Sequence, residues 1–139
     1  MSEALYHAAL VERARTAFGK GRLPDASASA TVDNPLCGDR VTLDLALKDG
    51  HIEKVGHQVR GCLLCEAAAA TIAEFCRGND QAELDAISAA ARKLMAEGGA
   101  LEPRWQCLEI FRPVHQAKSR RECVLLPFEA LKRAASTAF

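Results

Sequence analysis

The sequence has few aromatic residues, no excess of charge of either sign and no long apolar run. Aromatic side chains make up 5% of the 139 residues, so the core has to be built from small aliphatic groups. Lys and Arg total 18, as do Asp and Glu, and this balance gives no electrostatic case for binding nucleic acid or an anionic membrane. An apolar run of about 18 residues and the apolar core of a signal peptide are both missing, so we expect a soluble, cytoplasmic protein.

Alternating apolar residues predict a β-hairpin in the first half of the chain. Residues 41–48 alternate between apolar and polar side chains, which is typical of a half-buried strand. Asp49-Gly50 follows and is a strong signal for a two-residue turn. The next apolar positions, Ile52 and Val55, differ in parity, so we expect a bulge in the returning strand.

Helical periodicity accounts for much of the remaining chain. The segments with apolar residues every three to four positions are residues 3–17, 63–77, 81–97, 103–111 and 121–135. Asp80 and Glu83 form a capping box before the third segment, and Pro113 is expected to interrupt the chain after the fourth. Residues 26–32 are a weak strand candidate. We therefore predict one α+β domain over residues 1–139, with about five helices packed mainly on one face of a small three-stranded antiparallel sheet.

Three of the six cysteines lie in unusual local sequences. Cys37 stands in Asn-Pro-Leu-Cys-Gly-Asp, Cys62 in Arg-Gly-Cys-Leu-Leu-Cys, and Cys123 in Arg-Arg-Glu-Cys-Val-Leu-Leu. Cysteines in a cytoplasmic protein argue for metal or sulfur chemistry over disulfides. The hairpin register places Cys37 across from Cys62, within a slip of one residue, and Asp39 points to the same side as Cys37.

The positions of two of these cysteines favour the thiolate form. Cys62 and Cys123 each stand at the start of a predicted helix, where the partial positive charge of the helix end lowers the pKa of a thiol. Three thiolates and one carboxylate are a suitable ligand set for zinc or an iron–sulfur cluster. The predicted ligands are Cys37, Asp39, Cys62 and Cys123.

Other interpretations of these residue types remain open. Cys62 and Cys65 have the spacing of a thiol redox pair, although the chain lacks the alternating βαβ pattern of thioredoxin-like folds. Cys65 is otherwise a spare thiol near the site or a packing residue of its helix, and Asp39 has the alternative role of capping a turn. The residues expected to have only structural or surface roles are Cys76, Cys107, His7, His51, His57 and His115.

Three motifs in order resemble the iron–sulfur cluster assembly scaffolds of the IscU/SufU/NifU N-terminal type. Residues 34–40 look like the Asn-Pro-x-Cys-Gly-Asp motif of that family, and residues 61–67 are similar to its Gly-Cys-x-x-Ser-x-Ala segment. Cys123 and the helix after it fit the third cysteine. The spacing of 61 positions from Cys62 to Cys123 resembles the SufU branch, in which roughly residues 97–120 form an insertion. The chain departs from the family at Cys65, where serine is usual, and at Glu122, where IscU-type scaffolds carry histidine.

The resemblance implies a SufE/NifU-like fold and a role as scaffold or sulfur acceptor in iron–sulfur cluster assembly. In the SufU branch Cys37, Asp39, Cys62 and Cys123 hold zinc, and in the IscU branch the same positions hold a nascent [2Fe–2S] cluster. The implied partners are a cysteine desulfurase of the SufS or IscS type and recipient apo iron–sulfur proteins. Cys123 is the expected sulfur acceptor because it lies on an element separate from the hairpin. The alternatives are a zinc-dependent sulfurtransferase and a structural zinc module.

Overall fold

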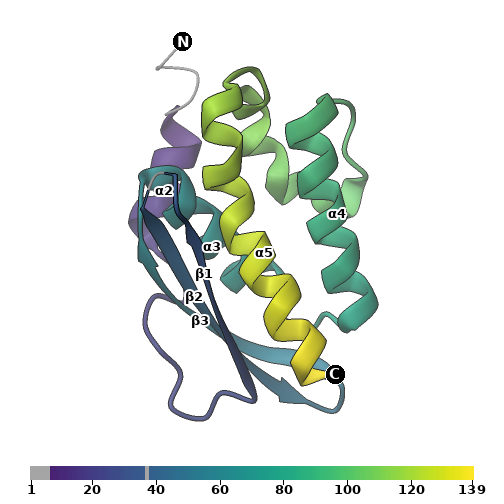
Figure 1. Ribbon diagram of the computed structural model, residues 1–139. Coiled ribbons are helices and arrows are strands. Elements are labelled where there is room, and N and C mark those ends of the chain that lie inside the picture. The colour runs from purple at the N-terminus through teal and green to yellow at the C-terminus, as the bar shows by residue number, and fades with distance from the viewer. Residues whose placement is uncertain (1–6, 37) are drawn as a thin grey trace.

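Three antiparallel strands in the order β1-β2-β3 form the sheet of this protein (Figure 1). The computed structural model describes residues 7–36 and 38–139, so Cys37 and residues 1–6 lie outside the described residues. The elements are α2 (Ala8–Thr16), β1 (Ala28–Asn34), β2 (Asp39–Lys48), β3 (His51–Arg60), α3 (Leu63–Phe75), α4 (Gln81–Glu97), the 3₁₀ helices η1 (Pro103–Gln116) and η2 (Lys118–Arg120), and α5 (Arg121–Ala138). This architecture confirms the predicted α+β class.

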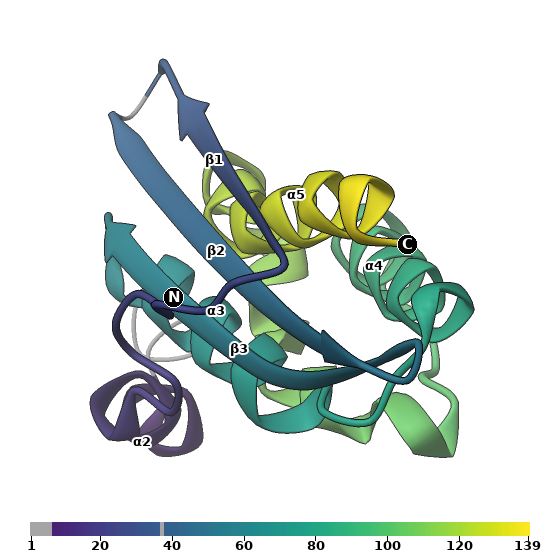
Figure 2. The same ribbon diagram turned by 90° about the horizontal axis from the view of Figure 1, so that it is seen from below.

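Helices α3 and α5 lie on the same side of the sheet, and α4 lies beyond α5 (Figures 1 and 2). Helix α3 is rich in buried alanines, and their small side chains let its backbone approach the neighbouring elements closely. The core contains more aromatic surface than the composition suggests, because Phe111 and Phe128 are both fully buried. Within the described part of the chain, no helix has the length and apolar character needed to cross a membrane.

The hairpin between β2 and β3 has the predicted turn and the predicted bulge. Lys48 pairs with His51, and Asp49 and Gly50 both have positive φ (55° and 77°), as a two-residue type I′ turn requires. Leu47 pairs with Ile52 and Ala46 with Lys54, so Glu53 has no partner on β2. The ladder then runs without a further shift to Arg40 and Arg60, beside the N-terminus of α3.

The segment between α2 and β1 makes hydrogen bonds to both β2 and β3. The Gly21 N–H donates to the carbonyl of His57 at 2.7 Å, and the Leu23 N–H donates to Asp44 Oδ2 at 2.9 Å. Asp44 is fully buried and also accepts hydrogen bonds from Arg22 and Ser29, so its charge is compensated.

The predicted capping box is confirmed, whereas two other local predictions differ from the structure. The capping box before α4 is present, with Glu83 N–H donating to Asp80 Oδ1 at 2.9 Å. The final helix extends to Ala138, three residues further than predicted. Pro113 does not interrupt the chain, because η1 continues through it to Gln116 in 3₁₀ geometry. In a 3₁₀ helix the N–H of residue 113 would donate to the carbonyl of Ile110, but proline has no N–H. The ring of His7 bonds to this carbonyl instead, with Nε2 at 2.7 Å from the oxygen.

Candidate metal centre

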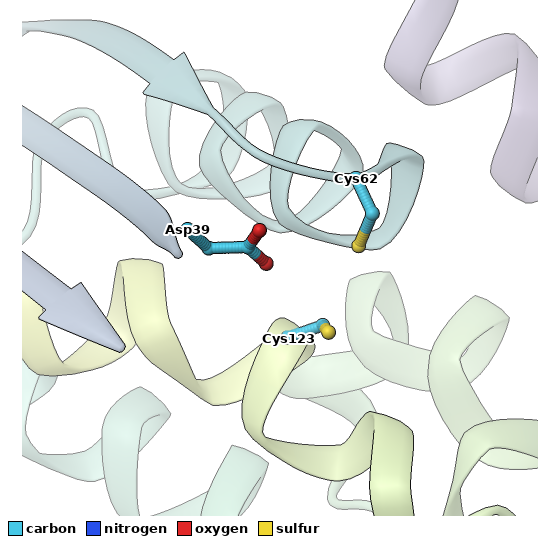
Figure 3. A group of neighbouring side chains, drawn as sticks. All are labelled: Asp39, Cys62 and Cys123. Atoms are coloured by element: carbon cyan, nitrogen blue, oxygen red, sulfur yellow. The ribbon is translucent and has the colours of Figure 1, made fainter. Parts of the chain in front are cut away.

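Asp39, Cys62 and Cys123 converge where β2, α3 and α5 begin (Figure 3). One carboxylate oxygen and the two sulfur atoms lie within 4.8 Å of one another. The three residues come from the start of β2, the N-cap of α3 and the first turn of α5. These are three of the four ligands predicted from the sequence, and the fourth, Cys37, lies outside the described residues.

Asp39 owes its position to two glycines. Gly38 has a φ of 76° and donates its N–H to the carbonyl of Asn34 at 2.8 Å, which closes the turn between β1 and β2. A Cβ atom added at Gly61 would lie 3.0 Å from the Asp39 carboxyl carbon. A side chain at position 61 would therefore press on the carboxylate, and the glycine leaves it room beside Cys62.

Cys62 is the half-buried N-cap of α3 and is poised as a thiolate. Hydrogen bonds from the Cys65 thiol, the Cys65 N–H, the Cys123 side chain and the Leu64 N–H outweigh burial and lower the pKa of Cys62 to about 5. The start of a helix supplies such N–H groups because they have no partner within the helix.

Cys123 shows the opposite behaviour. Burial, followed by the neighbouring Cys62 thiolate, raises the pKa of Cys123 to about 12, although the charge of Arg120 opposes this effect. The pKa values of the two thiols are therefore shifted in opposite directions, because neighbouring thiolates repel each other when no cation lies between them. A divalent metal ion would compensate both thiolates and the carboxylate, so the donor set fits a cation better than it fits an empty site.

The distances between the donor atoms also suit a metal. Two thiolates that bind one tetrahedral zinc, each at about 2.3 Å, lie about 3.8 Å apart. Separations within 4.8 Å reach that value after small rotations of the side chains. The group formed by Asp39, Cys62 and Cys123 can therefore hold a zinc ion or contribute ligands to an iron–sulfur cluster.

Cys65 lies one turn into α3, directly behind this group, and is fully buried. Its thiol donates to the carbonyl of Cys123 at 3.0 Å and lies 3.4 Å from Asp39 Oδ2. Its hydrogen bond to Cys62 and its burial strongly raise the pKa of Cys65, so it stays protonated and acts as a donor. The sequence left the place of Cys65 open between the site and the helix interior, and the structure puts it at the site.

The remaining cysteines lie elsewhere, and the five described cysteines are free thiols. Cys76 is buried in the core, where burial raises its pKa, and Cys107 is half-buried near Arg13. Both have the packing roles that the sequence predicts. Arg121, at the start of α5, donates a hydrogen bond to the carbonyl of His115.

Each of the four histidines has a role other than ligation among the described residues. The ring nitrogens of His7, His57 and His115 contact backbone carbonyls of Ile110, Phe18 and Met95, and His51 lies at the exposed end of the hairpin. These positions confirm the prediction that the histidines are structural or surface residues.

One feature beside the site was not predicted. Leu36 is 95% exposed and lies on a surface groove of about 410 Å³ between β1 and α5. This exposed apolar side chain stands directly before Cys37 in the sequence. Its signal in the sequence was a leucine inside a turn motif, where a polar residue is usual.

Comparison with known proteins identifies similar chains over nearly the full length. The NifU-like N terminal domain family matches residues 5–137. The iron-sulfur cluster assembly scaffold protein IscU of Thermotoga maritima is 25% identical over 130 residues, which are 94% of this chain and 92% of that protein. The zinc-dependent sulfurtransferase SufU of Bacillus subtilis is 24% identical over 133 residues, 94% of this chain and 89% of that protein.

A solved structure gives the same result for the fold. The crystal structure of a NifU-like protein (N-terminal) from Brucella abortus superposes with a TM-score of 0.91 at 30% identity. The superposition covers 99% of this chain and 96% of that one. The sheet, the helices and their order are therefore those of an experimentally determined structure.

Proposed function

This chain belongs to the family of NifU-like N-terminal domains, and on that premise we propose that it serves iron–sulfur cluster assembly as a scaffold and sulfur acceptor. The observation that carries the proposal is the convergence of Asp39, Cys62 and Cys123 from three separate elements to within 4.8 Å. Two similar proteins bear names that describe a cluster scaffold and a zinc-dependent sulfurtransferase, and both activities require thiolates of this kind.

The proposed ligands are Asp39, Cys62 and Cys123, together with Cys37. Cys37 is included because it lies two residues before Asp39 in the Asn-Pro-Leu-Cys-Gly-Asp motif. A resident zinc ion would keep the thiolates deprotonated, whereas an iron–sulfur cluster would be the cargo assembled on the same atoms.

We assign the sulfur-accepting step to Cys123. Its thiolate attacks the outer sulfur of a persulfide on the donor protein, so that a new S–S bond forms on Cys123. The donor's S–S bond breaks, and its electron pair leaves on the donor thiolate, so the exchange needs no external oxidant or reductant. Helix α3 stabilises Cys62 through backbone N–H groups, which makes it the better fixed ligand. Cys123 lies on α5, separate from the β2–β3 hairpin, so its thiolate can leave the ion without disturbing the sheet.

The expected donor is a cysteine desulfurase, and the expected recipients are apo iron–sulfur proteins. Leu36 and the groove beside it lie next to the proposed ligands and provide a surface on which a donor can dock. We place this activity in the cytoplasm, where thiols stay reduced. We also propose that residues 97–120, which include all of η1 and η2, are an insertion relative to shorter scaffolds.

A desulfurase assay tests the proposal. Sulfide release by a cysteine desulfurase is measured with and without this protein, and mass spectrometry locates the added sulfur. We expect stimulation, a persulfide on Cys123, and loss of that persulfide in Cys123→Ser. Cys107→Ser is the matched control, because that thiol is remote from the site. A protein that neither accepts sulfur nor assembles a cluster would contradict the proposal, and a persulfide on Cys62 alone would contradict the assignment to Cys123.

A structural zinc module is the second candidate, because the site ties together the ends of β2, α3 and α5. In that case removal of the metal unfolds the chain, as in small zinc-dependent domains. The large buried core that these elements share argues against this alternative. The effect of a chelator on the folded protein separates the two candidates.

A further inference from the structure

Helix α5 contains a proline at position 127, four residues after Cys123. In an α-helix the carbonyl of residue 123 accepts its hydrogen bond from the N–H of residue 127. Proline has no N–H, and its ring also crowds the carbonyl four residues earlier. Pro127 therefore leaves the carbonyl of Cys123 without its usual helical donor, although both residues are buried.

The thiol of Cys65 supplies a replacement. It comes from α3, is fully buried, and lies 3.0 Å from this carbonyl oxygen. A buried carbonyl that lacks a donor is unfavourable, so this contact is the partner that the carbonyl requires. Pro127 and Cys65 thus act together. The proline leaves a carbonyl of α5 without its helical donor, and the Cys65 thiol of the neighbouring helix α3 donates to that carbonyl.

The same thiol reaches the other two members of the metal group. Its sulfur lies 3.4 Å from Asp39 Oδ2, and it faces the sulfur of Cys62 at the start of the same helix. Cys65 thereby touches all three residues without being one of the mutually close ligand atoms. A thiol has one proton, so these acceptors share a single donor, and a shift of any one of them is felt by the others.

We propose that Cys65 and Pro127 are positioning residues of the metal site: the proline frees the Cys123 carbonyl, and the Cys65 thiol ties that carbonyl to the carboxylate of Asp39. This inference rests on the proposed function, because it takes Asp39, Cys62 and Cys123 as the ligands. Groups that orient metal ligands from behind typically change metal affinity 10–100-fold when they are lost.

The simpler account is that Cys65 only fills space, as buried cysteines commonly do. The two accounts differ in what Pro127→Ala does. Alanine restores an N–H that competes for the Cys123 carbonyl and removes the proline from the helix interior. If the pair positions the ligands, this variant melts at a higher temperature and yet binds zinc more weakly. If Cys65 only packs, the variant melts higher and its zinc affinity is unchanged.

The experiment measures zinc affinity by competition with a chromophoric chelator, the absorption spectrum of the cobalt-substituted protein, and the melting temperature of the metal-free protein. Cys65→Ala is expected to bind zinc at least about 10-fold more weakly and to alter the cobalt spectrum. Cys65→Ser keeps a donor and is expected to retain most of the affinity. Cys76→Ala is the matched control, since it also removes a fully buried thiol from the end of α3 but lies in the core.

A double-substituted protein completes the test. In the Cys65→Ala background, Pro127→Ala is expected to raise the melting temperature without any further loss of zinc affinity, because the tie is already absent. Equal losses from Pro127→Ala in both backgrounds, or unchanged affinity in Cys65→Ala, would overturn this inference and leave the proposed function standing. If the unsubstituted protein bound no zinc or cluster, the proposed function and this inference would both be wrong.

Discussion

Removal of the metal is expected to leave this protein folded and to lower its melting temperature by a calculable amount. The proposed ligands lie at the ends of β2, α3 and α5, whereas the large fully buried side chains, such as Leu45, Phe111 and Phe128, belong to a core that runs the length of the sheet. Loss of the ion leaves that core intact. The metal-free form should therefore keep its secondary structure and its fixed side-chain packing.

The size of the effect follows from mass action. A ligand that binds only the folded state adds about 2.7 kcal/mol when its free concentration is 100 times its dissociation constant. Unfolding entropy of about 2.1 cal/mol/K per residue gives about 0.3 kcal/mol/K for a chain of 139 residues. Zinc at that concentration should consequently raise the melting temperature by about 9 °C.

Circular dichroism melts in a zinc-buffered series measure this shift. The metal-free protein is the reference, and the melting temperature should rise with the logarithm of the free zinc concentration. Cys62→Ser should abolish most of the rise, and Cys107→Ser should preserve it. Collapse of the far- and near-ultraviolet signals on chelation would refute the reasoning and favour a structural zinc module. A shift that persists without both Asp39 and Cys62 would place the metal elsewhere.

Three further predictions concern residues away from the metal group. Asp44→Ala should cost about 1–3 kcal/mol in chemical denaturation, because the Ser29 hydroxyl and the Leu23 N–H lose their fully buried acceptor. Burial lowers the pKa of His57 below its usual 6.5, so the unfolded chain binds a proton at this residue more readily than the folded one. The free energy of unfolding should therefore fall as the pH drops below about 6.5. His57→Gln should reduce this dependence of stability on pH. Gly19→Ala should destabilise the protein strongly in thermal melts, because the new Cβ would lie 2.5 Å from the Cβ of Ala73.

Each of these three has a result that would contradict it. An Asp44→Ala protein as stable as the parent would mean that its buried hydrogen bonds contribute nothing. A pH profile that is unchanged in His57→Gln would assign the acid sensitivity to other groups. A Gly19→Ala protein with the parent's melting temperature would show that the backbone of the α2–β1 segment moves without cost. Gly50→Ala, where φ is also positive but no atom lies within 4 Å of the new Cβ, separates the clash from the backbone strain.

Local chemistry made much of the fold predictable from the sequence. The turn at Asp49-Gly50 and the box of Asp80 and Glu83 each depend on residues close in the chain, and both are present. The exception is Pro113, because the effect of a proline depends on what else can bond to the carbonyl that it leaves open. That partner is His7, more than a hundred positions away, and no local pattern reveals it.

In the candidate site, too, the residues in local motifs were predictable and the long-range contact was not. Asp39, Cys62 and Cys123 could be named from their motifs and from the hairpin register, and the structure brings them together. The contribution of Cys65 depends on its contact with Cys123, a residue of another helix that is 58 positions away in the sequence. A hydrogen bond between a side chain and a distant backbone carbonyl produces no periodic pattern in the sequence. The role of Cys65 at the site could therefore not be predicted from the sequence.

Glu53 is an extra residue in β3, because it has no partner on β2. Pairing skips this residue, so a chain shortened by its deletion could close the gap while every match from Val55 to Arg60 kept its partner. The apolar residues on either side would then alternate regularly, and the cysteine-bearing end would not move. A deletion between Val55 and Arg60 would instead turn the following side chains to the opposite face. Strand β3 therefore tolerates the loss of a residue near the Asp49-Gly50 turn, whereas the same loss near Arg60 would disrupt it.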